Sequence, residues 1–164
     1  MILIGIGSNL AAPPAETPLQ TVTAALDALA RAGIAIVKRS EWYLSEPVPA
    51  SSQPWFVNGV VSAASRLEPI ALLDQLLAIE RDFGRAREVP NAARTLDLDL
   101  LDHESRLCET AKLVLPHPRL HLRRFVLEPL CRIAPDWRHP RLGLTAAQLL
   151  ERLPPGQPVR RLDA

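Results

Sequence analysis

The stretch RTLDLDLL, Arg94 to Leu101, predicts one strand of the fold and raises a chemical question. Its leucines alternate with polar residues, which is the pattern of a strand with one buried face. Asp97 and Asp99 then share the opposite face, roughly 7 Å apart. Two carboxylates so placed repel each other, and a divalent cation such as Mg²⁺, which prefers oxygen ligands, would remove that repulsion. From the spacing alone, a solvated strand face and a metal site both remain open.

Further segments with strand or helix patterns surround this stretch. In chain order we predict a strand at 1–7, a helix at 19–33, strands at 34–43 and 56–64, a helix at 69–83 and a strand at 94–102. The order β-α-β-β-α-β is that of ferredoxin-like folds. We therefore expect an α+β chain with an antiparallel sheet and two helices on one face. A C-terminal helical segment, with a helix near 145–153, completes one domain over 1–164, because no linker interrupts the chain.

Composition limits the class of protein. The chain has 164 residues, of which 48% are apolar, and a net charge of +1, so we expect one compact core and no nucleic-acid or membrane partner. No apolar run approaches the ~18 residues of a membrane span, and the N-terminus resembles a strand, not a signal peptide. Cys108 and Cys131 form no disulfide framework, so we expect reduced thiols in a cytoplasmic protein. We expect a monomer, with a dimer left open.

Charged residues upstream of the aspartates suggest a polar site. Glu80 falls within the apolar arc of the second helix, so its carboxylate either borders a polar site or has turned out to solvent. Arg85, Arg87 and Arg94 bracket the loop that precedes Asp97. They are either a phosphate clamp or solvent-exposed arginines in an arginine-rich chain. A glycine before this loop and a proline within it leave a segment that can move as a lid.

Two other segments point to ligands. PHPRLHLRRF, Pro116 to Phe125, concentrates cationic side chains and is either a polyphosphate-facing segment or a surface loop; its histidine spacing is poor support for zinc. In PWFVNGVV, Phe56 and Asn58 share one strand face. An aromatic ring beside an amide suits a flat heterocycle with hydrogen-bonding edges, although core packing explains the same pattern. The chain contains no P-loop motif.

Placed in order, these motifs resemble the 6-hydroxymethyl-7,8-dihydropterin pyrophosphokinase family of folate biosynthesis. The matching elements are IGSNL at 6–10, the loop at 45–47, Gln53 with F-x-N at 56–58, Glu80 with GRxR at 84–87, RTLDLDLL at 94–101, LPHPRLHxRxFVLEPL at 115–130 and IAPDW at 133–137. The resemblance covers nearly the whole chain. It implies a transferase that moves pyrophosphate from ATP to the hydroxymethyl group of the pterin and releases AMP.

The resemblance also implies a set of site residues. Asp97 and Asp99 would bind two Mg²⁺ ions and, with Arg85 and Arg94, form the catalytic group. The implied ATP-binding residues are Glu80, Arg85, Arg87, Arg94, Leu100, Lys112, His117 and Arg123. The implied pterin-binding residues are Ser45, Pro47, Val48, Phe56, Asn58, Asp97 and Phe125, with the two phenylalanines on either side of the ring.

The chain departs from this family pattern in one loop. VPNAA stands before Arg94, where the family carries a segment one residue longer with a tryptophan. A paralogue that binds pterin or nucleotide without turnover is therefore one alternative. A ferredoxin-like RNA-binding module is a second, which an aromatic content of 4% and the lack of an RNP-like run disfavour.

Overall fold

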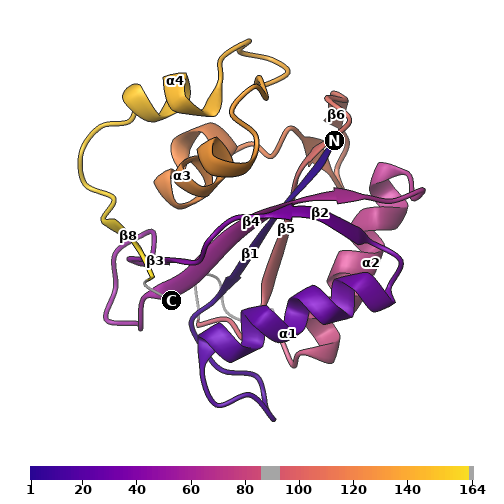
Figure 1. Ribbon diagram of the computed structural model, residues 1–164, viewed down its shortest axis with the longest axis vertical. Coiled ribbons are helices and arrows are strands. Elements are labelled where there is room, and N and C mark those ends of the chain that lie inside the picture. The colour runs from indigo at the N-terminus through magenta and orange to yellow at the C-terminus, as the bar shows by residue number, and fades with distance from the viewer. Residues whose placement is uncertain (86–92, 163–164) are drawn as a thin grey trace.

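A single antiparallel sheet forms the centre of the molecule. The computed structural model describes residues 1–85 and 93–162 (Figure 1). The strands of this sheet are β1 (Ile2–Ser8), β2 (Ala35–Arg39), β3 (Tyr43–Ser45), β4 (Phe56–Ala64), β5 (Asp97–His103) and β8 (Val159–Arg161). Their spatial order is β5-β1-β4-β3-β8, and β2 pairs with the other end of β4. The first and last strands of the βαββαβ unit thus lie side by side, which confirms the predicted ferredoxin-like arrangement.

Two helices, α1 (Pro18–Arg31) and α2 (Pro69–Asp82), cover one face of the sheet (Figure 1). Each has a proline in its first turn, where the missing N–H costs nothing. Each is followed by a glycine in the left-handed region, Gly33 at φ +81° and Gly84 at φ +77°, which glycine adopts without strain. Both predicted helix ends are therefore confirmed.

The opposite face is covered by the C-terminal half of the chain. A short 3₁₀ turn, η1 (Leu120–Leu122), leads into α3 (Arg124–Ile133), and α4 (Ala146–Glu151) packs against α3 in a second apolar cluster. Trp137 joins this cluster and donates its indole N–H to the buried Asp102 at 3.0 Å. The expected helix near 145–153 is present but shorter, with Thr145 as its N-cap.

The prediction of one strand at 34–43 is wrong, because the structure has two strands there, β2 and β3. The break falls at Ser40–Trp42, where the Ser40 hydroxyl accepts the Val60 N–H at 3.0 Å. The Trp42 ring lies so close to Gly59 that a Cβ there would come within 2.7 Å of it. The strand is therefore interrupted where the Trp42 ring packs over Gly59, which has no side chain.

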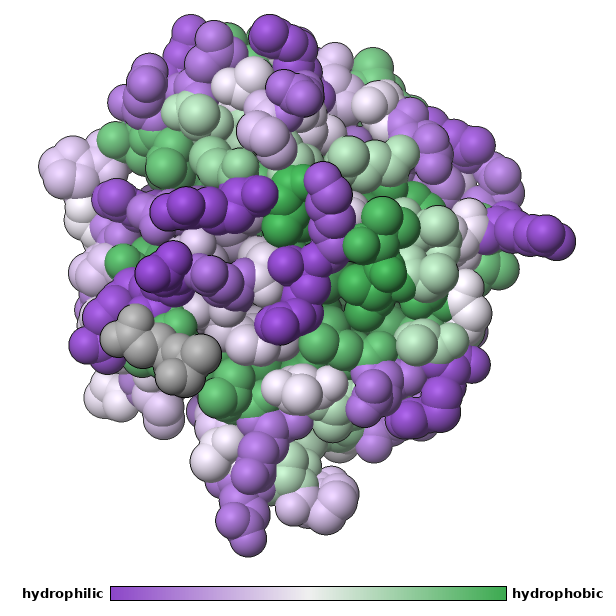
Figure 2. All heavy atoms as spheres, viewed as in Figure 1, coloured by the Kyte–Doolittle hydropathy of each residue, from purple (hydrophilic) through white to green (hydrophobic). Residues whose placement is uncertain are grey.

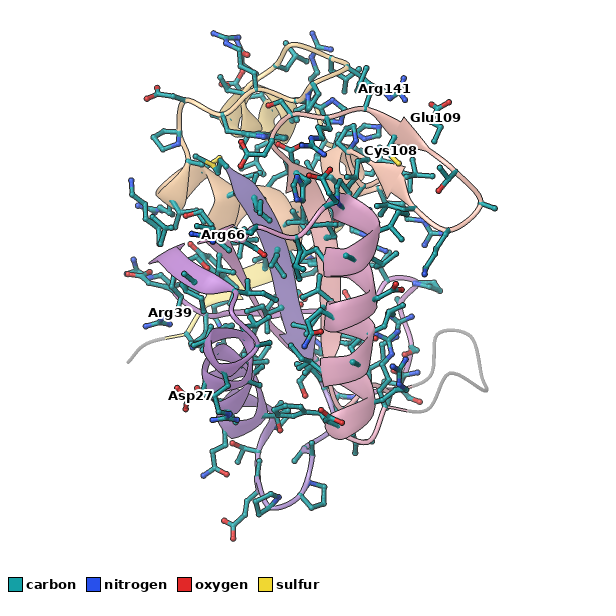
Figure 3. All side chains as sticks on the ribbon, turned by 90° about the vertical axis from the view of Figure 1, so that its right-hand side faces the viewer. Asp27, Arg39, Arg66, Cys108, Glu109 and Arg141 are labelled. Atoms are coloured by element: carbon teal, nitrogen blue, oxygen red, sulfur yellow. The ribbon has the colours of Figure 1, made fainter. Side chains whose placement is uncertain are left out.

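Several small elements were not predicted. Two of them, β6 (Cys108–Glu109) and β7 (Val114–Leu115), pair as a hairpin. The predicted strand β5 is also shorter than expected, since it begins at Asp97 and not at Arg94. Glu109 of this hairpin forms an ion pair with Arg141, from the segment before α4 (Figure 3). The strand β8, which pairs with β3, also had no signal in the sequence.

Within residues 1–85 and 93–162, no helix is long and apolar enough to cross a bilayer. Hydrophobic surface gathers near β2 with hydrophilic side chains around it (Figure 2), and Val37 of this strand is 64% exposed. Cys108 and Cys131 are free thiols.

Candidate active site

The two aspartates lie on the sheet face that α3 covers, beside a strip that carries no side chains. Asp97 and Asp99 are 18% and 27% exposed. Their partners on β1 are Gly7 and Gly5, and Gly7 in turn pairs with Asn58 on β4. The two glycines leave a bare stretch of backbone between the carboxylates and the Asn58 amide. A ligand can therefore approach the sheet closely at this point.

Asn58 is held firmly. It is 6% exposed, and its Nδ2 donates to the Ser45 hydroxyl of β3. A Cβ at Gly7 would lie 2.6 Å from Asn58 Oδ1, so the amide fills the space that the glycine leaves. The amide orientation is thus set by β1, β3 and β4 together.

A cavity opens over this amide. Arg123 stacks on the ring of Phe125 at its wall, 5.4 Å from the ring centroid. The lining residues are Ser45, Glu46, Pro47, Val48, Pro49, Gln53, Phe56, Asn58, Arg94, Asp97, Arg119, Arg123 and Phe125. The structure brings together in this one cavity all seven residues that the resemblance implied for the pterin.

A second, larger and more open cavity adjoins the first. The two share Arg94, Asp97, Arg119 and Arg123. The other lining residues of the larger cavity include Leu73, Leu77, Glu80, Arg85, Leu98, Asp99, Leu100, Lys112 and His117. Every residue that the resemblance implied for ATP is therefore in this cavity, except Arg87, which lies outside the described residues. Lys112 is paired with Asp74 at its rim.

A network of ion pairs connects the helix α2 to the aspartates. The Arg85 guanidinium donates to Glu80 Oε1 at 2.8 Å and to Asp97 Oδ1 at 2.6 Å. Arg94 donates to Asp97 Oδ2 at 3.0 Å, and Arg123 to Asp99 Oδ2 at 3.4 Å. Each aspartate is thus compensated by arginine. Such charge-assisted bonds hold the arginines where an incoming anion would meet them.

Glu80 is a buried acceptor and is not turned out to solvent. It is 2% exposed, and its Oε1 also accepts the Leu98 N–H at 2.9 Å. This contact ties the end of α2 to β5, midway between the two aspartates. The polar-site interpretation of Glu80 is therefore the one that the structure favours.

The electrostatics of the site shift two titrating groups. Burial, and next the neighbouring Asp97 carboxylate, raise the pKa of Asp99 to about 7. Burial and the Arg123 charge lower the pKa of His117 to about 4. Its Nδ1 accepts the Arg119 N–H at 3.1 Å, so the neutral ring carries its proton on Nε2 and can donate one hydrogen bond from there.

Two residues of the site were missed by the sequence reasoning. Asn9 is 2% exposed; its Oδ1 accepts the Arg94 N–H at 2.7 Å, and its Nδ2 donates to Gln53 and to the Pro54 carbonyl. It joins the segments that bring two cavity walls together. Arg119 lines both cavities, and within 1–85 and 93–162 its guanidinium forms no ion pair. Its place in the cationic 116–125 segment was the available signal.

The residues present fit a hard divalent cation. In the part of the chain that the structure describes, no group of three or more His, Cys, Asp or Glu side chains is placed to hold a metal by itself. Asp97 and Asp99 supply two carboxylates. Burial, and next the neighbouring Asp97 charge, raise the pKa of Asp99, and a cation between the carboxylates would offset both effects. Mg²⁺ typically takes one or two carboxylates together with substrate phosphates.

The two adjoining cavities share one carboxylate and three arginines. Such an arrangement is typical of enzymes that hold a phosphate chain beside a second substrate. A sequence model described as 7,8-dihydro-6-hydroxymethylpterin-pyrophosphokinase matches residues 3–135. This chain belongs to that family.

Individual relatives agree with the family match. The chain is 43% identical over 151 residues to the 2-amino-4-hydroxy-6-hydroxymethyldihydropteridine pyrophosphokinase of Synechocystis, covering 92% of this chain and 75% of the relative. It is 41% identical over 140 residues to the enzyme of the same name from Pseudomonas aeruginosa, covering 85% and 83%. A crystal structure of HPPK-DHPS in complex with substrates matches in fold, with a TM-score of 0.67 at 13% identity, over 92% of this chain and 42% of that one.

Proposed function

We propose that this chain transfers pyrophosphate from ATP to the hydroxymethyl group of 6-hydroxymethyl-7,8-dihydropterin and releases AMP. The hydroxyl oxygen attacks the β-phosphorus and forms a new O–P bond, and the bond from that phosphorus to the α-phosphate oxygen breaks. AMP leaves with the electrons of the broken bond, and the hydroxyl proton is released to solvent. The observation that carries the proposal is the junction of the two cavities at Asp97. An acceptor in the smaller cavity and a triphosphate in the larger one would meet at that carboxylate.

The smaller cavity suits the pterin. Phe56 and Phe125 both line it and offer faces for an offset stack on a flat ring. The Asn58 amide, oriented by Ser45, offers a donor and an acceptor to the ring edge. Asp97 lies at the end where the hydroxymethyl group would sit, and its negative charge favours loss of the hydroxyl proton.

The larger cavity suits the triphosphate. Arg85, Arg94 and Arg123 are held there by carboxylates in the structure described above. A polyphosphate would compete for these guanidinium groups, which bind planar oxyanions in a bidentate manner. Neutral His117 adds one N–H donor without adding charge. The arginines thus neutralise the charge that develops on the leaving AMP and the transferred group.

We include Mg²⁺ in the proposal, held by Asp97 and Asp99. Bound there with the nucleotide, it would neutralise phosphate charge and act as a Lewis acid. The short spacing of the two carboxylates supports two ions. We also propose that the chain acts in the cytoplasm, as a monomer, on small molecules and not on nucleic acid. Size-exclusion chromatography would test the oligomeric state, and a nucleic-acid binding assay would test the absence of that partner.

The decisive experiment is AMP release from ATP with and without the reduced pterin, at varied Mg²⁺. We expect release only with both. Asp97→Asn and Asp99→Asn should abolish turnover while the circular dichroism spectrum stays native, because the side chains keep their size and lose their charge. Asp27→Asn, at an exposed position on α1 that lines neither cavity, is the matched control and should stay active. Near-normal activity in both site variants would refute the metal assignment, and ATP binding without AMP release would favour the non-catalytic paralogue.

A further inference from the structure

The segment that follows α4 touches both walls of the smaller cavity. On one side, β8 pairs antiparallel with β3, with Val159 opposite Ser45. The Glu46 N–H donates to the Pro158 carbonyl at 3.4 Å. Ser45 and Glu46 both line the cavity. Figure 1 shows β8 beside β3 at the edge of the sheet, away from α1 and α2.

On the other side, one side chain of the same segment holds the start of α3. Gln157 Nε2 donates to the Leu122 carbonyl at 2.9 Å, and Gln157 Oε1 accepts the Arg124 N–H at 3.0 Å. These two backbone groups flank Arg123 in the chain. Arg123 and Phe125 line the cavity wall that faces Ser45.

The start of α3 depends on this contact because it lacks a cap of its own. Arg123 is the N-cap residue, and its side chain makes no capping hydrogen bond. The first N–H groups of a helix have no partner within the helix, and a side-chain oxygen usually satisfies one of them. Gln157 provides that oxygen from a position 33 residues away in the chain.

Building on the proposed function, we propose that Gln157 is a positioning residue for the pterin subsite. The segment from Gln157 to Val159 bridges the β3 wall and the α3 wall, and Gln157 sets the distance between them. Apolar anchors such as Val126 and Leu127 hold the body of α3 in the core. Ahead of those anchors, Arg123 pairs with Asp99 and the Phe125 ring packs against the same cluster. Gln157 adds the contacts that hold the backbone on both sides of Arg123. Its loss should loosen the pterin wall and leave the Glu80–Arg85 side of the nucleotide cavity unchanged.

Calorimetry on the full chain tests this inference, with the reduced pterin titrated in the presence of Mg²⁺ and a non-hydrolysable ATP analogue. Gln157→Ala should raise the pterin Kd about three- to tenfold, the equivalent of one or two exposed hydrogen bonds. The Kd of the ATP analogue alone should rise less than the pterin Kd, because Arg123 is the one residue of the Arg123–Phe125 stretch that also lines the larger cavity. Gln157→Glu keeps the acceptor for Arg124 but cannot donate to Leu122, so its pterin Kd should lie between wild type and Gln157→Ala.

Arg160→Ala is the matched control, since it lies on β8, pairs with Leu44 through its backbone and is exposed. It should bind both ligands as wild type does. Amide exchange at Arg124 should be faster in Gln157→Ala than in this control.

The possible failures are distinct. If the wild-type protein releases AMP in the presence of the pterin and Gln157→Ala binds the pterin with the same Kd, the positioning role of Gln157 is refuted and the proposed reaction is not. An equal rise in both Kd values together with a lower Tm would show a general structural role and also overturn it. Wild-type protein that binds the pterin without releasing AMP would refute the proposed reaction while the Gln157 comparison still decides the positioning role. Wild-type protein that binds no pterin would refute both.

Discussion

Replacing Gly7 by alanine tests the close approach of β1 to the Asn58 amide. The new Cβ would lie 2.6 Å from Asn58 Oδ1, well inside van der Waals contact. Asn58 is 6% exposed and bonded to Ser45, so it cannot move without breaking that bond. Gly5 lies two residues away on the same strand, and a Cβ there would come no closer than 3.6 Å to Leu101, an ordinary contact. Gly5→Ala therefore adds the same methyl group without the clash.

The size of the effect follows from this geometry. Overpacking costs about 1–3 kcal/mol, which corresponds to a Tm lower by about 2–12 °C for a chain of this length. The gain from a less flexible unfolded chain is common to both variants and cancels between them. An Asn58 amide turned away from the ligand loses about 1–2 kcal/mol of recognition, a rise in the pterin Kd of about 5- to 30-fold.

Thermal unfolding and calorimetry measure the two effects. Titration of the reduced pterin into protein with Mg²⁺ and a non-hydrolysable ATP analogue gives the pterin Kd, and a titration of the analogue alone serves as the internal reference. We expect Gly7→Ala to lose more pterin affinity than Gly5→Ala, because only the Gly7 methyl group displaces the Asn58 amide. Equal affinity and equal Tm in the two variants would show that the Gly7–Asn58 contact does not shape the site.

The buried Glu80 carboxylate accepts hydrogen bonds from the Arg85 guanidinium and from a backbone N–H. Urea unfolding of Glu80→Ala should show a loss of about 3 kcal/mol in unfolding free energy, the lower end for a broken buried pair, because Arg85 keeps Asp97 as a second partner. Asp74→Ala, at an exposed position on the same helix, should lose no more than about 1 kcal/mol. Phe125→Ala should raise the pterin Kd by about tenfold and the ATP Kd less, and calorimetry giving the reverse order would mean that the two subsites are misassigned. Burial holds the pKa of His139 below its usual value, and its Nδ1 accepts two backbone N–H groups. The unfolded chain therefore binds the extra proton first, so the unfolding free energy should fall as pH drops below about 6.5, and the fall should be smaller in His139→Asn when urea unfolding at pH 7.5 and 5.0 is compared.

Much of the fold could be predicted because its signals are local. The alternation around Asp97 places both aspartates on one face, and glycines mark the ends of both sheet-packed helices. The position of Glu80 on an apolar arc left two interpretations open, a carboxylate at a polar site or one turned out to solvent, and the structure favours the first. Each of these inferences uses residues within a few positions of one another, where backbone geometry alone relates side chains to faces.

The break between β2 and β3 could not be predicted in the same way. The segment 34–43 has the composition of one strand, and it divides because Trp42 finds space over Gly59, 17 positions further along the chain. Local propensity is weaker than burial of a large aromatic ring. The short strands β6, β7 and β8 were missed for a related reason, since two or three residues carry too little pattern to be recognised.

The sequence by itself determined the order of the main βαββαβ elements, the paired aspartates of β5 and, through its motifs, the family. Only the tertiary structure decided which arginine pairs with which aspartate, how Asn9 joins the Gln53 segment to Arg94, and that Gln157 caps α3. The physical reason is the distance along the chain between the partners. Periodicity and capping signals record neighbours in sequence, whereas a cavity is built from side chains and backbone groups that meet only when the sheet and the helices that cover it have assembled.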